Sequence, residues 1–147
     1  MKRKLNVLGL NPEQEKMIQH ILDQIKEKSE TWFIKQLVEA VTLANGDNRE
    51  DAIRYIDELL KKYPRLSKYS KANLYYLRGL ANRNMGNLKE GLANFDYAIT
   101  LNPNREGIYY YDRAILKKQK GDLDGWQSDI NTGREIFPEW YDDTIGS

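Results

Sequence analysis

The chain of 147 residues is long enough to bury one sizeable core but short for two domains, so it predicts a single domain. Its 23 Lys and Arg residues nearly balance its 22 Asp and Glu residues, and neither sign collects on a long stretch, which argues against a general nucleic-acid-binding surface. The absence of cysteine excludes disulfides, thiol nucleophiles and thiolate metal sites.

Residues 1–10 are expected to form an N-terminal tail. Residues 1–4 are basic, but three charges make a weak patch. The apolar run over residues 5–10 contains Asn6 and Gly9 and is too short for a secretory signal or a membrane span. We therefore expect a soluble, cytoplasmic protein.

Residues 11–30 predict a capping helix in front of the rest of the fold. Asn11 is the expected N-cap, Pro12 suits the first turn, and Gln14 completes a capping box. One face of this helix carries an apolar stripe, formed by Met17, Ile18, Ile21, Leu22 and Ile25. His20 is the single histidine of the chain, and its place beside this stripe favours a helix-border residue over a catalyst.

Internal repetition dominates the remaining sequence. The block from Gly86 to Pro103 recurs 35 residues later as the block from Gly121 to Pro138, and a weaker copy runs from Gly46 to Pro64. The prolines that close the blocks are spaced by 39 and 35 residues, which indicates a 34-residue period with insertions of five and one. Proline-free, helix-forming segments precede the blocks, at residues 31–45, 71–85 and 106–120. Each repeat is therefore predicted to be a helix, a tight turn and a second helix.

The turns carry local signals of their own. Gly46, Gly86 and Gly121 stand where the first helix of each repeat must end, and glycine adopts a left-handed conformation without strain. The second helices are expected to be capped by Asn48 (with Asp51), Asn87 (with Glu90) and Asp122.

This pattern resembles the tetratricopeptide repeat (TPR), in the style of bacterial, including cyanobacterial, TPR proteins. The matching units cover residues 33–66, 72–105 and 107–139, followed by a tail over residues 140–147. The usual small side chains of the family occur at Ala40, Gly79 and Ala114 and at Ala52 and Gly91, and the usual large ones at Ile56, Phe95 and Ile130. Trp126 departs from the pattern at a small position, where Gly133 is expected to make room for it. The resemblance implies an all-α, right-handed α-solenoid of three helix pairs.

The acidic stretch over residues 121–130 raises the question of a calcium or catalytic site. With Gly125 at the sixth place of an EF-hand loop, Lys120 would occupy the first ligand position and Asn131 the last, which disfavours calcium. Asp124 and Asp129 are instead expected on a solvated helix face. No phosphate loop, metal-ligand pattern or nucleophile motif occurs, so we expect no enzyme, no metal and no cofactor.

The TPR resemblance implies a concave partner surface lined by the first helix of each unit. Carried over onto this chain, the candidate partner-binding residues are Asn73, Tyr76, Arg83, Asn84, Tyr111, Lys118 and Gln119. The neighbouring Tyr75 and Tyr110 are expected in the core. At the places where chaperone adaptors hold a terminal carboxylate, this chain has Leu37, Val41, Leu77, Ile108 and Asp112, so no chaperone-tail receptor is implied.

The end of the array is a second candidate surface. Trp126, Trp140 and Tyr141 could contact a partner or a second copy there, unless the tail folds onto the last unit. We expect a non-catalytic protein–protein interaction module, an adaptor or scaffold that binds a peptide or helix of another protein. The alternatives are a homo-oligomeric scaffold, assembled through the N-terminal helix or the C-terminal end, and a regulatory domain or subunit of an enzyme. RNA binding is a weaker alternative because of the near-neutral charge.

Overall fold

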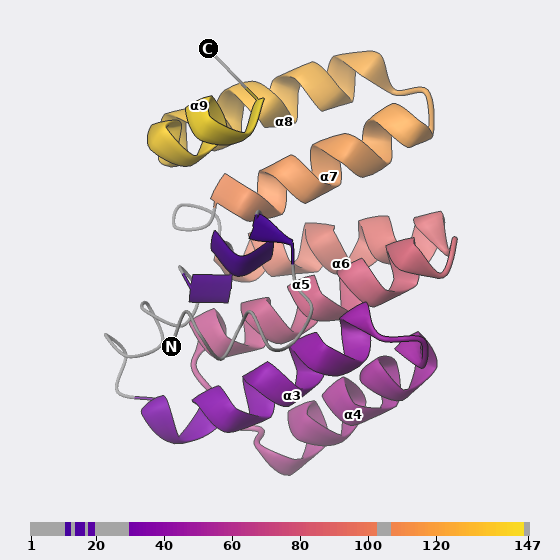
Figure 1. Cartoon of the computed structure of the whole chain (residues 1–147), viewed down its shortest axis with the longest axis vertical. Helices are drawn as coiled ribbons and strands as arrows, with labels where there is room; N and C mark the ends of the chain where they lie inside the picture. Colours follow the sequence, from indigo (N-terminus) through magenta and orange to yellow (C-terminus); the bar gives the residue numbers. More distant parts are fainter. Residues whose placement is uncertain (1–10, 13, 17, 20–29, 103–106, 146–147) are drawn as a thin grey trace.

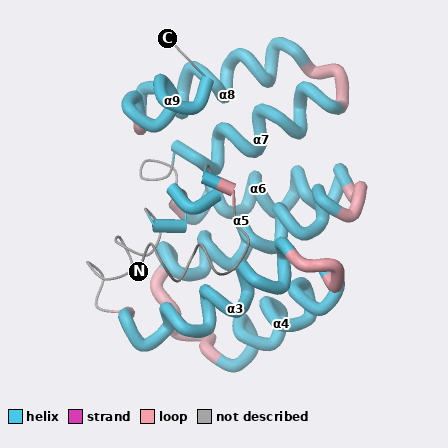
Figure 2. Tube along the Cα trace, viewed as in Figure 1, coloured by secondary structure: helices cyan, strands magenta, loops and turns pink. Residues whose placement is uncertain are grey.

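The computed structural model describes residues 11–12, 14–16, 18–19, 30–102 and 107–145. All elements in these ranges are helical, so the all-α class is confirmed (Figures 1 and 2). They are the 3-10 helix η1 (Thr31–Phe33) and the α-helices α3 (Ile34–Asn45), α4 (Arg49–Lys62), α5 (Lys68–Asn84), α6 (Leu88–Leu101), α7 (Gly107–Gln119), α8 (Leu123–Ile136) and α9 (Pro138–Ile145). None of the described helices is both long and apolar enough to cross a membrane.

The helices form three antiparallel pairs that follow one another through the molecule (Figure 1). The pairs are α3 with α4, α5 with α6 and α7 with α8, and neighbouring pairs meet through α4 against α5 and α6 against α7. The helix α5 also contacts α3 and α7, so the first helices of the three pairs lie side by side. We call their shared surface the first-helix face.

The turns inside the second and third pairs end on left-handed glycines, as expected. Gly86 has a φ of 84° and Gly121 a φ of 85°. The amide of the next residue donates to a carbonyl five residues back, from Asn87 to Asn82 (2.8 Å) and from Asp122 to Lys117 (2.8 Å). Gly46 does not share this role, since its φ is −85° and α3 ends without a left-handed residue.

The capping predictions are confirmed at two helix starts and wrong at two others. Asp122 accepts from the Gly125 amide (2.9 Å), and Asn11 and Gln14 exchange the two bonds of a capping box (3.0 and 2.8 Å). Asn48 and Asn87 stand at the N-caps of α4 and α6 but make no capping bond. Both are exposed, so water can satisfy the amides of the first turn.

A further cap, at the start of α5, has no counterpart in the sequence analysis. Ser67 accepts from the Ser70 amide (3.1 Å). The Glu30 carboxylate, from the segment before η1, accepts from both serine hydroxyls. Burial alone would raise the pKa of Glu30, but the bonds from Ser67 and Ser70 outweigh burial and lower it.

The small side chains set the distance between the helices of a pair. A Cβ atom on Gly79 of α5 would overlap the ring of Phe95, which is fully buried on α6. A Cβ atom on Gly91 would lie 3.3 Å from the Gly79 carbonyl oxygen. The large and small positions of the repeat therefore interlock at the α5–α6 contact.

The C-terminal residues fold onto the last pair as α9. Trp140 is 3% exposed and Tyr141 fully buried, so the structure shows the alternative in which these residues fold onto the last pair. The reason is that the phenol of Tyr141 lies against Gly133 and donates to the Gly107 carbonyl (2.5 Å). Gly133 thus makes room for Tyr141, and the expectation that it makes room for Trp126 is wrong.

The N-terminal segment, by which we mean the described residues among 11–19, lies on the first-helix face (Figure 1). From residue 12 onward these residues are helical, and Ile18 is buried in the main core at 3% exposure. Lys16 forms an exposed ion pair with Asp143 of α9 (3.4 Å). The expected tail over residues 1–10, His20 and most of the apolar stripe fall outside the described residues.

Candidate functional site

Two of the candidate partner-binding residues lie in the interior. Asn73 and Tyr76 are both fully buried, so they lie between the helices and not on the first-helix face. The hydroxyl of Tyr76 donates to the Asp112 carboxylate of α7 (2.7 Å), and the hydroxyl of Tyr109 donates to Asn73. These polar tips find partners between α5 and α7, which allows the rings to be buried.

Asp112 joins Tyr76 and Arg83 in a buried network between α5 and α7. The Asp112 side chain is 3% exposed and accepts from Arg83 Nη1 at 2.8 Å. Burial, reinforced by the Asp112 charge, raises the pKa of Tyr76 well above its ordinary value. Burial alone would lower the pKa of Arg83, but Asp112 outweighs it and raises that pKa. Tyr76 therefore stays neutral and Arg83 stays charged, and both are paired with Asp112.

A small cavity, which we call the central cavity, lies beside this network under the N-terminal segment. Its volume is about 120 Å³. It is lined by Asn11, Gln14, Ala44, Leu80, Arg83, Asn84, Tyr111, Asp112, Ile115 and Trp140. The candidate residues Arg83 and Asn84 therefore line a small, partly open cavity between the chain's own segments. The Asn84 carbonyl oxygen accepts from Arg49 Nη1 (2.9 Å), which joins α4 to the end of α5.

A larger groove, which we call the terminal groove, lies between α7, α8 and the end of α9. Its volume is about 500 Å³, and it is lined by Tyr111, Ile115, Lys118, Gln119, Trp126, Ile130 and Ile145. Three candidate groove residues, Tyr111, Lys118 and Gln119, thus meet the candidate end residue Trp126 in one place. The ammonium of Lys118 lies 4.6 Å from the ring centre of Trp126, within the range of a cation–π contact.

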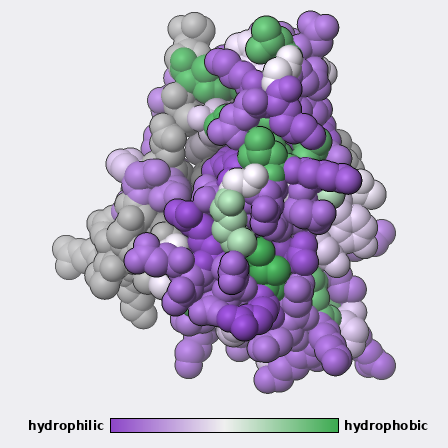
Figure 3. All heavy atoms as spheres, turned by 90° about the vertical axis from the view of Figure 1, so that its right-hand side faces the viewer, coloured by the Kyte–Doolittle hydropathy of each residue, from purple (hydrophilic) through white to green (hydrophobic). Residues whose placement is uncertain are grey.

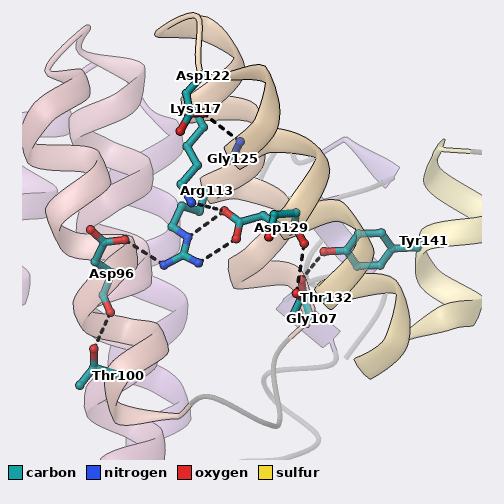
Figure 4. Close-up of polar contacts among 11 residues, drawn as sticks. Asp96, Thr100, Gly107, Arg113, Lys117, Asp122, Gly125, Asp129, Thr132 and Tyr141 are labelled. Carbon is teal, nitrogen blue, oxygen red and sulfur yellow. Dashed lines mark hydrogen bonds and ion pairs between the residues drawn. The ribbon is translucent and has the colours of Figure 1, made fainter.

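Arg113 of α7 ties together the helices α6, α7 and α8 (Figure 4). Its guanidinium makes two bonds to Asp129 of α8 (2.8 and 2.7 Å) and one to Asp96 of α6 (2.9 Å). Lys117 adds a contact of 3.0 Å to Asp129. Burial alone would lower the pKa of Arg113, but its bonds to Asp129 and Asp96 raise it. Asp129 is therefore a buried, paired carboxylate, and its expected place on a solvated face is wrong because α7 covers it.

The second pair repeats this arrangement in a more exposed form. Arg78 of α5 contacts Asp57 of α4 (3.0 Å) and Asn94 of α6 (3.3 Å). Sequence reasoning missed both bridges. The signal was present, because the two arginines are 35 residues apart and Asp57 and Asp96 are 39 apart, the same spacings as the closing prolines.

The acidic stretch over residues 121–130 does not form one site. Asp122 caps α8, Asp124 is exposed and Asp129 is paired with Arg113 (Figure 4). Within the described ranges, no group of three or more His, Cys, Asp or Glu side chains is placed to hold a metal ion. Asp122 and Asp129 therefore have separate structural partners, and Asp124 lies on the surface.

The face at the turn ends of the pairs is mostly hydrophilic, and its hydrophobic surface is divided into separate patches (Figure 3). This face therefore shows no broad apolar surface of the kind that marks a large interface.

Searches against protein-family models, curated proteins and solved structures find no match for this chain.

Proposed function

We propose that the protein is a non-catalytic protein–protein interaction module, a cytoplasmic adaptor with the right-handed solenoid arrangement of TPR units, which binds a segment of a partner protein in the terminal groove. The observation that carries the proposal is the convergence of Tyr111, Lys118, Gln119 and Trp126 on one open groove. Aromatic side chains beside an apolar floor are the usual anchors of protein interfaces.

The lining of the groove indicates the chemistry of the partner. Ile115, Ile130 and Ile145 supply an apolar floor, and Lys118 supplies a positive charge at its edge. The neighbouring Lys117 is already paired with Asp129. A partner segment with a large apolar side chain next to an acidic residue would complement this surface.

The position of the N-terminal segment favours a helical partner segment. It lies on the first-helix face as a helix with a capping box at its start, and Ile18 is buried against the fold. The same face therefore already accepts a helix of this chain beside the terminal groove. The helix-in-groove mode of recognition requires an anchor residue of this kind.

Site-specific photo-crosslinking in the cells that produce the protein would test the proposal. A crosslinking amino acid at Gln119 lies at the groove, whereas the same amino acid at Leu123 lies on exposed α8 surface outside the groove lining. We expect a distinct partner to be crosslinked from position 119 and not from position 123. With the purified partner segment, Trp126→Ala should raise the dissociation constant at least about tenfold. This is the effect expected of a hot-spot residue.

The matched control for affinity is Leu123→Ala, which removes an exposed apolar side chain from the same helix. It should leave the dissociation constant within about twofold. Equal crosslinking at both positions, or an unchanged affinity of Trp126→Ala, would contradict the groove proposal. Crosslinks between two copies of this chain from position 119 would instead support the homo-oligomeric scaffold.

A further inference from the structure

A second groove lies at the α3–α4 end of the molecule, opposite α8 and α9 (Figure 1). We call it the corner groove, because it follows the connection between α4 and α5. Its volume is about 370 Å³, and it is lined by Trp32, Lys62, Tyr63, Pro64, Arg65 and Leu66. It shares no lining residue with the terminal groove, so the two grooves are separate.

Trp32 brings an open aromatic side chain to the corner groove. It belongs to η1 and is 52% exposed, although it is one of the largest apolar side chains of the fold. The rings of Phe33 and Tyr63 contact it edge to face, with ring centres 5.6 and 5.1 Å away. Aromatic rings favour this geometry in pairs and in clusters. An aromatic side chain of a ligand would therefore extend a cluster that the chain has already begun.

The walls of the corner groove are held in place by contacts within the chain. Phe33, next to Trp32, is fully buried and anchors η1 in the core. The Leu66 amide donates to the Tyr63 carbonyl oxygen (3.3 Å), and the Ser67 amide donates to the carboxylate that precedes η1 (3.2 Å). A groove that is already formed loses little conformational freedom when a ligand binds, which favours affinity.

The rim of the corner groove is positively charged and unpaired. Lys62 and Arg65 line the groove, and Lys61 and Lys68 flank them in the sequence. All four side chains belong to exposed residues, and none forms an ion pair with a described residue. The short stretch over residues 61–71 contains no carboxylate that could neutralise them. A ligand with negative charges would complement this rim.

The surroundings of the groove favour a peptide over a nucleic acid. Single-stranded nucleic acids bind where successive bases stack on aromatic rings along a basic track. The planes of Trp32 and Tyr63 are inclined by 64°, so they do not form such a platform. Asp57 and Glu58 are exposed on α4 just before the basic stretch and would repel a phosphate backbone. A short acidic peptide with one aromatic side chain matches both the ring cluster and the limited rim.

We propose that the corner groove binds an acidic segment of a partner protein through one aromatic side chain. This side chain packs against Trp32 and Pro64, and carboxylates beside it pair with Lys62 and Arg65. The site goes beyond the function proposed for the terminal groove and does not depend on it, because the two grooves lie at opposite ends of the three helix pairs.

The test is an NMR titration of the full chain, labelled with nitrogen-15, with the end-blocked pentapeptide Asp-Glu-Phe-Asp-Glu. Each of Trp32, Trp126 and Trp140 gives one indole N–H resonance, and Trp32→Phe assigns the first. We expect the peptide to shift the Trp32 resonance in a saturable way. The uncharged peptide Asn-Gln-Phe-Asn-Gln has almost the same shape and should bind at least about tenfold more weakly. The peptide Asp-Glu-Ala-Asp-Glu lacks the aromatic anchor and should bind at least about fivefold more weakly.

Two double variants separate the rim of the groove from the general charge of the protein. Lys62→Gln with Arg65→Gln removes the lining cations and should lower the affinity for the acidic peptide at least about tenfold. Lys89→Gln with Lys120→Gln removes two exposed cations outside the groove lining and should leave the affinity within about twofold.

An unshifted Trp32 resonance would overturn the proposal, and so would a shift confined to Trp126, which would place the peptide in the terminal groove. Equal binding of the uncharged peptide, or undiminished binding by the Lys62→Gln, Arg65→Gln variant, would overturn it as well. A single-stranded hexauridylate that shifts Trp32 at lower concentration than the acidic peptide would show that the groove takes a nucleic acid instead.

Discussion

The hydroxyl group of Tyr141 fills the space that a Cβ atom on Gly133 would occupy, and it donates to the carbonyl oxygen of Gly107. Gly107 begins α7, Gly133 lies in α8 and Tyr141 lies in α9, so this contact joins the last three helices. The absence of a side chain at position 133 therefore allows α9 to pack directly on α8.

Gly133→Ala should destabilise the protein by about 1–3 kcal/mol, because overpacking exceeds the gain in helix propensity of up to about 1 kcal/mol. Tyr141→Phe removes the closest clashing group, the hydroxyl, and should itself cost about 1 kcal/mol for the lost hydrogen bond. Gly133→Ala should therefore cost less in the Tyr141→Phe background, although the ring atoms Cζ and Cε2 still crowd the added Cβ. Urea unfolding of the two single variants and the double variant measures this coupling, and strictly additive effects would contradict it. Tyr97→Phe, at an exposed tyrosine, is the control.

The two arginine bridges should differ in their effect on stability. Arg113→Met leaves Asp129 buried with Lys117 as its remaining cation, and we expect a loss of about 2–4 kcal/mol. Arg78→Met breaks a pair whose aspartate, Asp57, is half exposed, and we expect a loss of about 0–1 kcal/mol. Equal losses in denaturant unfolding would show that burial does not control the strength of these bridges.

The Glu30 carboxylate, which binds the start of α5, should make the free energy of unfolding depend on pH. Because the pKa of Glu30 is lowered in the folded state, its contribution is present above the ordinary carboxyl pKa and is lost as pH falls through the folded pKa. Glu30→Gln should therefore be less stable than the parent near pH 7, and the difference should shrink toward about pH 3. Urea unfolding across this range checks the trend. Glu135→Gln, at an exposed position of α8, should show no such convergence.

The packing of the N-terminal segment on the first-helix face should contribute to stability mainly through Ile18, and far less through the ion pair of Lys16. Ile18→Ala removes a buried apolar side chain, and we expect a loss of about 2–4 kcal/mol. Lys16→Ala breaks an exposed pair with Asp143 and should cost at most about 0.5 kcal/mol. Thermal unfolding compares the two. An Ile18→Ala variant as stable as the parent would show that the segment does not stay on the first-helix face in solution.

The helix pairs could be predicted from the sequence because their signals are local. Gly86 and Gly121 mark their turns by conformation alone, and Asp122 caps α8 with an amide three residues away. The repeated blocks in the sequence then indicated that the same helix–turn–helix arrangement recurs. The contact of α9 was less accessible, because the place of Tyr141 depends on two glycines that lie 34 and eight residues earlier in the chain.

The candidate site was predicted less well, for a related reason. Tyr76 and Tyr111 hold matching places in successive repeats, yet Tyr76 is fully buried and Tyr111 partly exposed. The Tyr76 hydroxyl donates to Asp112 of the next pair, whereas the Tyr111 ring packs against Trp140 and Tyr141 of α9. A pattern within one repeat cannot show which of its tyrosines meets a carboxylate from the next.

The arginine bridges join only neighbouring pairs among the three described pairs. Arg78 and Arg113 each reach back to an aspartate of the preceding pair, Asp57 or Asp96. At the same repeat position the first unit has Glu39, which would repel such an aspartate, and the last unit has Asn131 where the aspartate would stand. Neither end can form the next bridge with another copy of these units. A further helix pair at the α3–α4 end would need Glu39→Arg, and one at the α7–α8 end would need Asn131→Asp, to form the same bridge.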